Sequence, residues 1–120
     1  MENFKLAESE YRFAMIVWEN EPINSGELVT LCEKNLGWKK STTYTVLKKL
    51  CEKGLFKNEA AIVTAIIKMA QVQRFESEHF ICRTFGGSLP QFITAFMGDK
   101  KLSKQEAEQL KQLIDRYKEV

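Results

Sequence analysis

One predicted helix constrains the fold of this 120-residue chain more than any other segment, because its faces differ sharply. It is capped by Lys40 or Ser41 and runs to Lys53. At helical spacing it carries a stripe that should be buried, made of Thr43, Val46, Leu47 and Leu50. Its other faces hold hydroxyl and ammonium groups and no carboxylate, from Ser41, Thr42, Thr45, Lys48 and Lys49. Gly54 then ends the helix, and a strand-like run begins.

The segments around this helix predict a winged helix-turn-helix. A first helix is expected at about 8–19, with acids in its first turn, and Asn24 should cap a second helix that runs to about Lys34. Two short strands are expected at 55–58 and 62–66, joined by a turn at 59–61. Trp18 and Trp38 are expected to anchor the core or a subunit interface. The fold class is therefore mainly α with a small β-hairpin wing.

The second half of the chain has the pattern of a helical dimerisation region. Three helices are expected: one at about 69–84, a short one that begins at Ser88, and one from Ser103 to about Tyr117. Gly86-Gly87 and Gly98 mark the breaks between them. These helices have few places to bury their large apolar side chains. Either they fold back on the first half or, as we favour, they pack against a second copy. The expected domains are 1–67 for DNA binding and 68–120 for dimerisation. The expected dimer interface contains Phe75, Phe80, Phe85, Leu89, Phe92, Phe96, Leu110 and Ile114.

Charge points to double-stranded DNA as the partner. Residues 39–57 hold six lysines and one glutamate, in a chain whose net charge is only +2. Such a run can also be an ordinary solvated helix face. Lysines suit phosphates, whereas short hydroxyl side chains suit base edges, although Ser41 and Thr42 could instead cap the helix. The predicted DNA-binding residues are Lys39, Lys40, Ser41, Thr42, Tyr44, Thr45, Lys48, Lys49 and Lys57.

Other classes of function lack their signatures. The N-terminus has no signal-peptide pattern and no apolar run approaches a membrane span, so a cytoplasmic protein is expected. Cys32, Cys51 and Cys82 form no CxxC pair, and His79 with Cys82 is only a weak metal pair, so no metal or cofactor is expected. With one histidine and no catalytic motif, the chain is not expected to be an enzyme.

Several motifs, in order, resemble those of the BlaI/MecI-type penicillinase repressors, to which CopY-type copper repressors are related. They are Glu8-Ser9-Glu10 before Trp18, the helix that ends in Lys53-Gly54-Leu55, and Phe85-Gly86-Gly87-Ser88-Leu89 leading to Ala95-Phe96 and Leu102-Ser103. The resemblance covers about residues 6–117. The cysteine pairs of the copper repressors are absent from the sequence, which disfavours metal sensing.

The resemblance implies a homodimeric repressor that binds palindromic operators of β-lactam resistance genes through an N-terminal winged helix. It implies relief of repression by cleavage in the C-terminal region, after a membrane sensor with a metalloprotease domain detects the antibiotic. The family's scissile bond aligns with Ala95-Phe96, a pair that could equally serve in packing. No direct membrane binding is implied.

The wing departs from the family pattern. Family wings usually carry basic residues, whereas the turn here is Glu59-Ala60-Ala61, and Lys57 is the one nearby cation that we assign to DNA. This departure leaves open an alternative, a winged-helix regulator that senses a small ligand directly or uses its wing for protein contact. Ligand stabilisation in a thermal-shift screen would favour that alternative. The operator, the regulated genes and the inducer cannot be deduced from the sequence.

Overall fold

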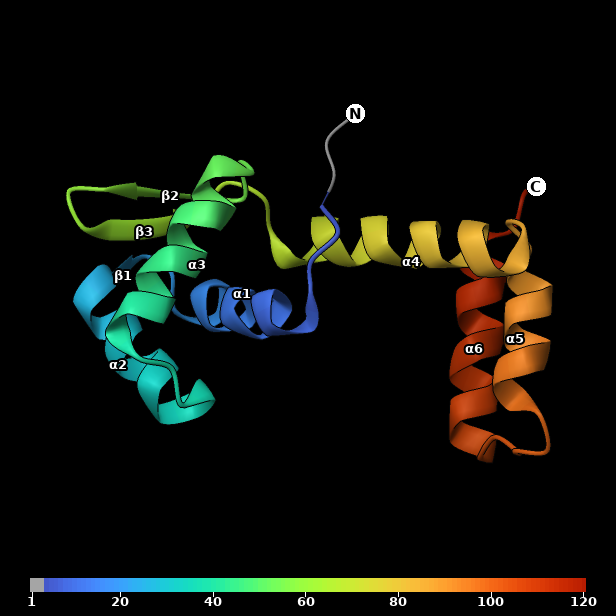
Figure 1. Ribbon diagram of the computed structural model, residues 1–120. Helices are drawn as coiled ribbons and strands as arrows, with labels where there is room; N and C mark the ends of the chain where they lie inside the picture. Colours follow the sequence, from blue (N-terminus) through green and yellow to red (C-terminus); the bar gives the residue numbers. More distant parts are fainter. Residues whose placement is uncertain (1–3) are drawn as a thin grey trace. The chain divides into compact units, whose positions relative to one another are not determined.

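The computed structural model describes residues 4–120, and the chain forms two compact units that join between Phe80 and Ile81. Figure 1 shows the order of helices and strands. The helices are α1 (Glu8–Asn20), α2 (Ser25–Leu36), α3 (Lys40–Glu52), α4 (Met69–Phe85), α5 (Leu89–Met97) and α6 (Lys104–Tyr117). The strands are β1 (Ile23–Asn24), β2 (Phe56–Glu59) and β3 (Ile62–Ala65). This is the mainly helical winged-helix class that the sequence predicts.

Local sequence signals explain where the first three helices begin and end. The α1 helix has Glu8 and Glu10 in its first turn, where the helix dipole favours acids. The Asn24 side chain caps α2 by accepting a hydrogen bond from the Gly26 N–H, and Gly37 ends α2 with a φ of 69°. The predicted N-cap of α3, Lys40 or Ser41, was one or two residues late. Lys39 is its N-cap residue, and it makes no side-chain capping bond.

The sheet has three strands, so the expectation of a simple hairpin was incomplete. The strand order is β1-β3-β2 and both pairings are antiparallel, with Ile23 opposite Val63 and Phe56 opposite Ala65. The two-residue strand β1 is too short to leave a periodic pattern in the sequence.

The turn of the wing is shorter than the sequence suggested. Glu59 belongs to β2, and only Ala60 and Ala61 form the turn, with φ values of 51° and 63°. Such left-handed conformations are unfavourable for alanine and are the reason that two-residue hairpin turns favour Asn-Gly.

One hydrophobic core holds the first unit together. Phe13, Val17, Leu28, Leu50 and Val63 have no exposed surface. Both tryptophans pack against this core, as predicted. The Trp38 ring stacks on Phe13 at 5.8 Å between centroids, and the Trp18 ring meets Phe56 edge to face at 6.2 Å. The α3 helix contacts both α2 and β2, which fixes it on this core.

The first part of α4 belongs to the first unit, because Val72 is fully buried in its core. The compact units therefore divide later in the chain than residues 67 and 68. The functional boundary expected there, between DNA binding and dimerisation, stays a prediction. In the second unit, Ser88 and Ser103 cap α5 and α6 by accepting hydrogen bonds from the backbone N–H groups of Gln91 and Glu106. Within residues 4–120, no helix is long and apolar enough to cross a membrane.

Candidate nucleic-acid interface

The α3 helix separates its side chains as its sequence pattern predicts. Thr43, Leu47 and Leu50 are buried and Val46 is half-buried. The hydroxyl and lysine side chains are all exposed, namely Ser41, Thr42, Thr45, Lys48 and Lys49. The exposed side of α3 therefore offers hydrogen-bonding and cationic groups to an external ligand.

The N-terminal turn of α3 is left open. It has no acidic residue and no side-chain cap, so the alternative in which Ser41 or Thr42 caps the helix is wrong. The hydroxyl of Thr45 donates a hydrogen bond of 2.9 Å to the Ser41 carbonyl oxygen, but its oxygen can still accept. The uncapped N–H groups and the positive end of the helix dipole favour an anion beside Lys39 and Lys40.

The lysines of this surface are not equivalent. Within residues 4–120, Lys39, Lys40 and Lys48 are exposed and form no ion pair. The Lys57 ammonium group on β2 lies 3.2 Å from a carboxylate oxygen of Glu59, which partly neutralises its charge. The three unpaired lysines are therefore available to pair with an external anion.

Lys49 has a structural partner that sequence reasoning missed. Its Nζ atom lies 2.8 Å from Oε2 of Glu10, a residue that is only 6% exposed. The other carboxylate oxygen of Glu10 accepts a hydrogen bond of 2.8 Å from the Ala7 N–H at the start of α1. One carboxylate thus links the N-terminus of α1 to the exposed face of α3.

The charge state of Glu10 depends on this linkage. Burial by itself disfavours the ionised form, but Lys49, the Ala7 N–H and the nearby charge of Lys53 together hold the pKa of Glu10 below its usual value. Glu10 is therefore a carboxylate at neutral pH. A sequence pattern could show it only as one of two acids in the first turn of α1.

Tyr44 also connects helices. It is half-buried, and its hydroxyl donates a hydrogen bond of 3.3 Å to Oγ of the buried Ser25 at the start of α2. This bond holds α3 against the preceding helix of the helix-turn-helix. The prediction that Tyr44 contacts DNA is untested, but its hydroxyl already has a partner in the protein.

The cysteines and the histidine have ordinary surroundings. Cys32 is buried and Cys51 half-buried, and burial raises the pKa of both thiols. The imidazole of His79 stacks on Phe75 at 5.8 Å between ring centroids. Among residues 4–120, no group of three or more His, Cys, Asp or Glu side chains could hold a metal ion.

The predicted dimer-interface residues lie along α4, α5 and α6. Phe75 is half-buried and packs edge to face against Phe4, whereas Phe85 and Phe92 meet each other at 5.5 Å between ring centroids. The other five are exposed in the single chain, namely Phe80, Leu89, Phe96, Leu110 and Ile114. None of the described residues of α5 and α6 is buried.

The predicted cleavage site lies near the end of α5. Ala95 is exposed and Phe96 is 58% exposed in the single chain, while the Phe96 ring lies 5.9 Å from the Phe92 ring, so cleavage and packing both stay predictions for this pair. The Lys100 ammonium group lies 4.8 Å from the centre of the Phe96 ring. The helix ends one residue later, at Met97, and Gly98 follows it.

Two sequence comparisons agree with this architecture. The family model described as penicillinase repressor matches residues 6–116. A protein of Bacillus licheniformis named penicillinase repressor is 23% identical over 118 residues, which cover 95% of this chain and 92% of that protein. A match of this extent includes the winged helix and all three helices that follow it. The chain therefore belongs to the penicillinase repressor family and is a DNA-binding transcriptional repressor.

Proposed function

We propose that this repressor acts as a homodimer on palindromic operators of β-lactam resistance genes and that cleavage in α5 relieves repression. The observation that supports operator binding is the exposed side of α3, which combines hydroxyls, unpaired lysines and an uncapped N-terminus. A helix with such a surface suits the major groove, where its N-terminal residues meet base edges.

Ser41, Thr42 and Thr45 are the proposed base contacts. Their short side chains can donate or accept hydrogen bonds, and the methyl groups of the two threonines can contact thymine methyls. We place Lys39, Lys40 and Lys48 on phosphates, where they set affinity and register but not sequence preference. Lys49 and Lys57 should contribute less to phosphate binding, because each already has a carboxylate partner.

The wing should contribute little to DNA affinity. Its turn consists of Ala60 and Ala61, and Lys57 is its one cation among the residues of β2 and β3 that the structure describes. The neighbouring Glu59 is exposed and would repel a phosphate. We therefore assign recognition mainly to α3.

The second unit should provide the dimer contact. The exposed apolar side chains of α5 and α6 lie at the spacing of single helix faces, and they include Phe96, Ile114 and Tyr117. Exposed apolar groups of this density favour association with a second copy. Two linked winged helices bind paired half-sites far more tightly than one, because the second binding event becomes intramolecular.

Cleavage at Ala95-Phe96 would separate α6 from the rest of the chain. A protease binds its substrate in an extended form, so the last turn of α5 must open before cleavage. Its position beside Gly98, at the end of a helix of nine residues, makes such local opening inexpensive. We propose a membrane sensor metalloprotease as the partner that performs this cleavage.

DNA footprinting on the promoter of the protein's own gene tests the proposal. We expect a protected palindrome and binding that weakens steeply with salt. Lys48→Ala should reduce affinity for all duplexes and lower the log–log salt slope by about 0.9 per subunit. Lys34→Ala is the matched control, because Lys34 is exposed on α2 outside the proposed interface. An unchanged salt slope for Lys48→Ala would remove Lys48 from the phosphate contacts.

A further inference from the structure

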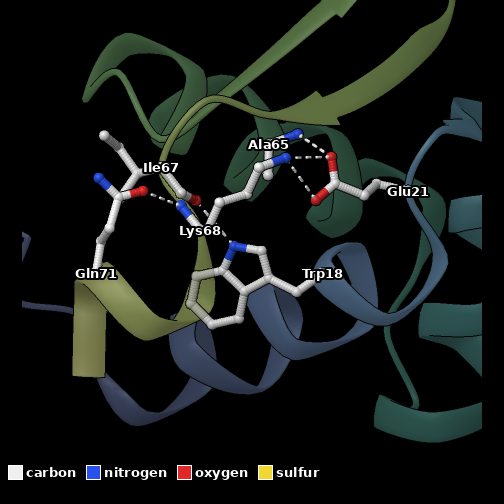
Figure 2. Close-up of polar contacts among 6 residues, drawn as sticks. All are labelled: Trp18, Glu21, Ala65, Ile67, Lys68 and Gln71. Atoms are coloured by element: carbon white, nitrogen blue, oxygen red, sulfur yellow. Dashed lines mark hydrogen bonds and ion pairs between the residues drawn. The ribbon is translucent and has the colours of Figure 1, made fainter. Parts of the chain in front are cut away.

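The chain between the wing and α4 is held by two side chains at the C-terminal end of α1, Trp18 within the helix and Glu21 directly after it. Figure 2 shows the Glu21 carboxylate directed at two groups of this segment, the Ala65 N–H and the Lys68 ammonium group. Oε1 of Glu21 accepts a hydrogen bond of 2.8 Å from the Ala65 N–H. Both carboxylate oxygens of Glu21 lie 3.2 Å from Lys68 Nζ. The Trp18 indole N–H donates a hydrogen bond of 3.0 Å to the Ile67 carbonyl oxygen. We call residues 65–68 with Trp18 and Glu21 the α1–α4 joint.

Every backbone N–H of residues 65–68 has a partner within the protein. Ala65 donates to Glu21, both Ile66 and Ile67 donate to the Leu55 carbonyl oxygen, and Lys68 donates to the Gln71 side chain. A flexible linker leaves such groups to water. The α1–α4 joint is therefore a rigid connection, even though the Ile66 side chain is exposed.

The place of Glu21 indicates a specific role. It follows the last residue of α1, where the negative end of the helix dipole disfavours a carboxylate. Its contacts with Ala65 and Lys68 offset that cost. Because its partners lie more than 40 positions away in the sequence, the Glu21 carboxylate contributes to tertiary geometry more than to the stability of α1.

The rigid connection continues into α4. Val72 is fully buried, the Gln73 amide donates a hydrogen bond of 3.1 Å to the Tyr11 hydroxyl, and a Glu76 oxygen lies 3.4 Å from the Leu6 nitrogen. The first two turns of α4 are thus fixed to α1 and the segment before it. The same helix begins the region that we assign to dimerisation and runs on to Phe85, past the division between the two compact units.

We infer that Trp18 and Glu21 are positioning residues that set which operator spacing this repressor accepts. The inference rests on the proposed function, because spacing has meaning only for a dimer on paired half-sites. Each base pair added between half-sites moves them apart by about 3.4 Å and rotates them by about 35°. A rigid joint cannot follow that change, whereas a loosened joint can follow it without altering α3.

Four single variants of the full chain separate the contacts, and a double variant combines Glu21→Ala with Trp18→Phe. Glu21→Ala removes the acceptor for Ala65 and the partner of Lys68, whereas Glu21→Gln keeps an acceptor for Ala65. Trp18→Phe keeps an aromatic ring and removes the N–H that reaches Ile67. Glu19→Ala is the matched control, since Glu19 is exposed on the same helix and outside the joint. Protection of amides in Phe13 and Leu28 against hydrogen exchange verifies that each variant remains folded.

Hydrogen exchange of residues 65–68 tests the joint without any DNA. We expect Glu21→Ala and Trp18→Phe to speed exchange of these amides by about tenfold or more, with partial rescue by Glu21→Gln and no effect of Glu19→Ala. Rapid exchange of these amides in the wild-type chain, or no change in the variants, would overturn the rigid joint whether or not the protein binds DNA.

Changes in operator spacing test the role of the α1–α4 joint in DNA binding. The probe is a duplex enriched by the wild-type chain from a random pool, remade with one or two base pairs inserted between its half-sites. We expect the insertions to weaken binding of the wild type by about tenfold or more. They should weaken binding of the Glu21→Ala, Trp18→Phe double variant by about threefold or less. The two proteins should bind an isolated half-site with equal affinity. Failure of the wild type to bind any duplex would sink the proposed function and the spacing role with it. Equal spacing penalties in both proteins would overturn the spacing role alone.

Discussion

Phe13, Leu28 and Val63 have no exposed surface in the first unit, whereas no described residue of α5 or α6 in the second unit is buried. Apolar residues make up a similar fraction of both regions, but only the first surrounds them with its own helices and sheet. The second presents Leu89, Phe96 and Ile114 outward. A repressor built this way gains its DNA-binding surface from intramolecular folding, and we expect it to gain operator affinity from association.

Removal of α6 should have the largest effect, because it should abolish association through the second unit and leave the first unit folded. A chain truncated after Ala95 is expected to be largely monomeric, because it lacks the apolar residues of α6 and the end of α5. Its affinity for a paired operator should fall by about 10²–10⁴, the range that linkage of two binding sites provides. Analytical ultracentrifugation and mobility-shift titration measure the two effects. A stable dimer of the truncated chain would contradict the assignment of the second unit to dimerisation.

Core and surface truncations should then separate the two regions by their concentration dependence. Leu28→Ala is expected to lower the free energy of unfolding by about 2–5 kcal/mol at any protein concentration, since Leu28 is fully buried. Ile114→Ala should change the stability of the monomer by less than about 0.5 kcal/mol. It should, however, weaken dimerisation by about tenfold.

Urea unfolding at several protein concentrations distinguishes these variants. Asp115→Ala, one residue from Ile114 and exposed on the same helix, controls for general effects on α6. An effect of Ile114→Ala that is large and independent of concentration would place Ile114 in an intramolecular core.

The link between α1 and α3 should show as a pH dependence of the first unit. The pKa of Glu10 is lower in the folded chain than its ordinary value of 4.5. Its contribution to stability is therefore fully present above pH 4.5 and is lost as the pH falls through the lower folded pKa. We expect Glu10→Gln to lower the free energy of unfolding by about 1–2 kcal/mol at pH 7, allowing for the solvent exposure of Lys49.

The difference between wild type and Glu10→Gln should shrink as the pH drops below 4, measured by urea unfolding. Glu8→Gln provides the control, because Glu8 is exposed in the same helical turn. A difference that stays constant down to pH 3 would show that charge is not what Glu10 contributes.

The wing turn should give the smallest effect, with the opposite sign. Ala61→Gly is expected to stabilise the first unit by about 0.5–1 kcal/mol, because glycine adopts a φ of 63° without the steric cost that alanine has there. Thermal unfolding measures this change. Ala70→Gly in α4 should instead destabilise, since glycine is a poor helix former. Equal responses at the two positions would mean that the turn is not strained.

Local patterns in the chain were sufficient to predict most of the fold. The period of Thr43, Leu47 and Leu50 predicted which side of α3 is buried, and Asn24, Ser88 and Ser103 predicted the starts of three helices. These signals work because a helix face and a helix cap each depend on residues within a few positions of one another. The exposed residues of the candidate interface were predicted for the same reason.

Contacts between segments distant in the sequence were decided only by the folded chain. Glu10 and Lys49 are 39 positions apart, and Glu21 and Ala65 are 44 apart, so no local pattern could pair them. The two-residue strand β1 exists only because β3 lies beside it. Residue spacing along the chain reports which surfaces an element will bury or expose. Which side chains then fix those elements to one another depends on packing in three dimensions, because only the folded chain brings residues that are distant in sequence into contact.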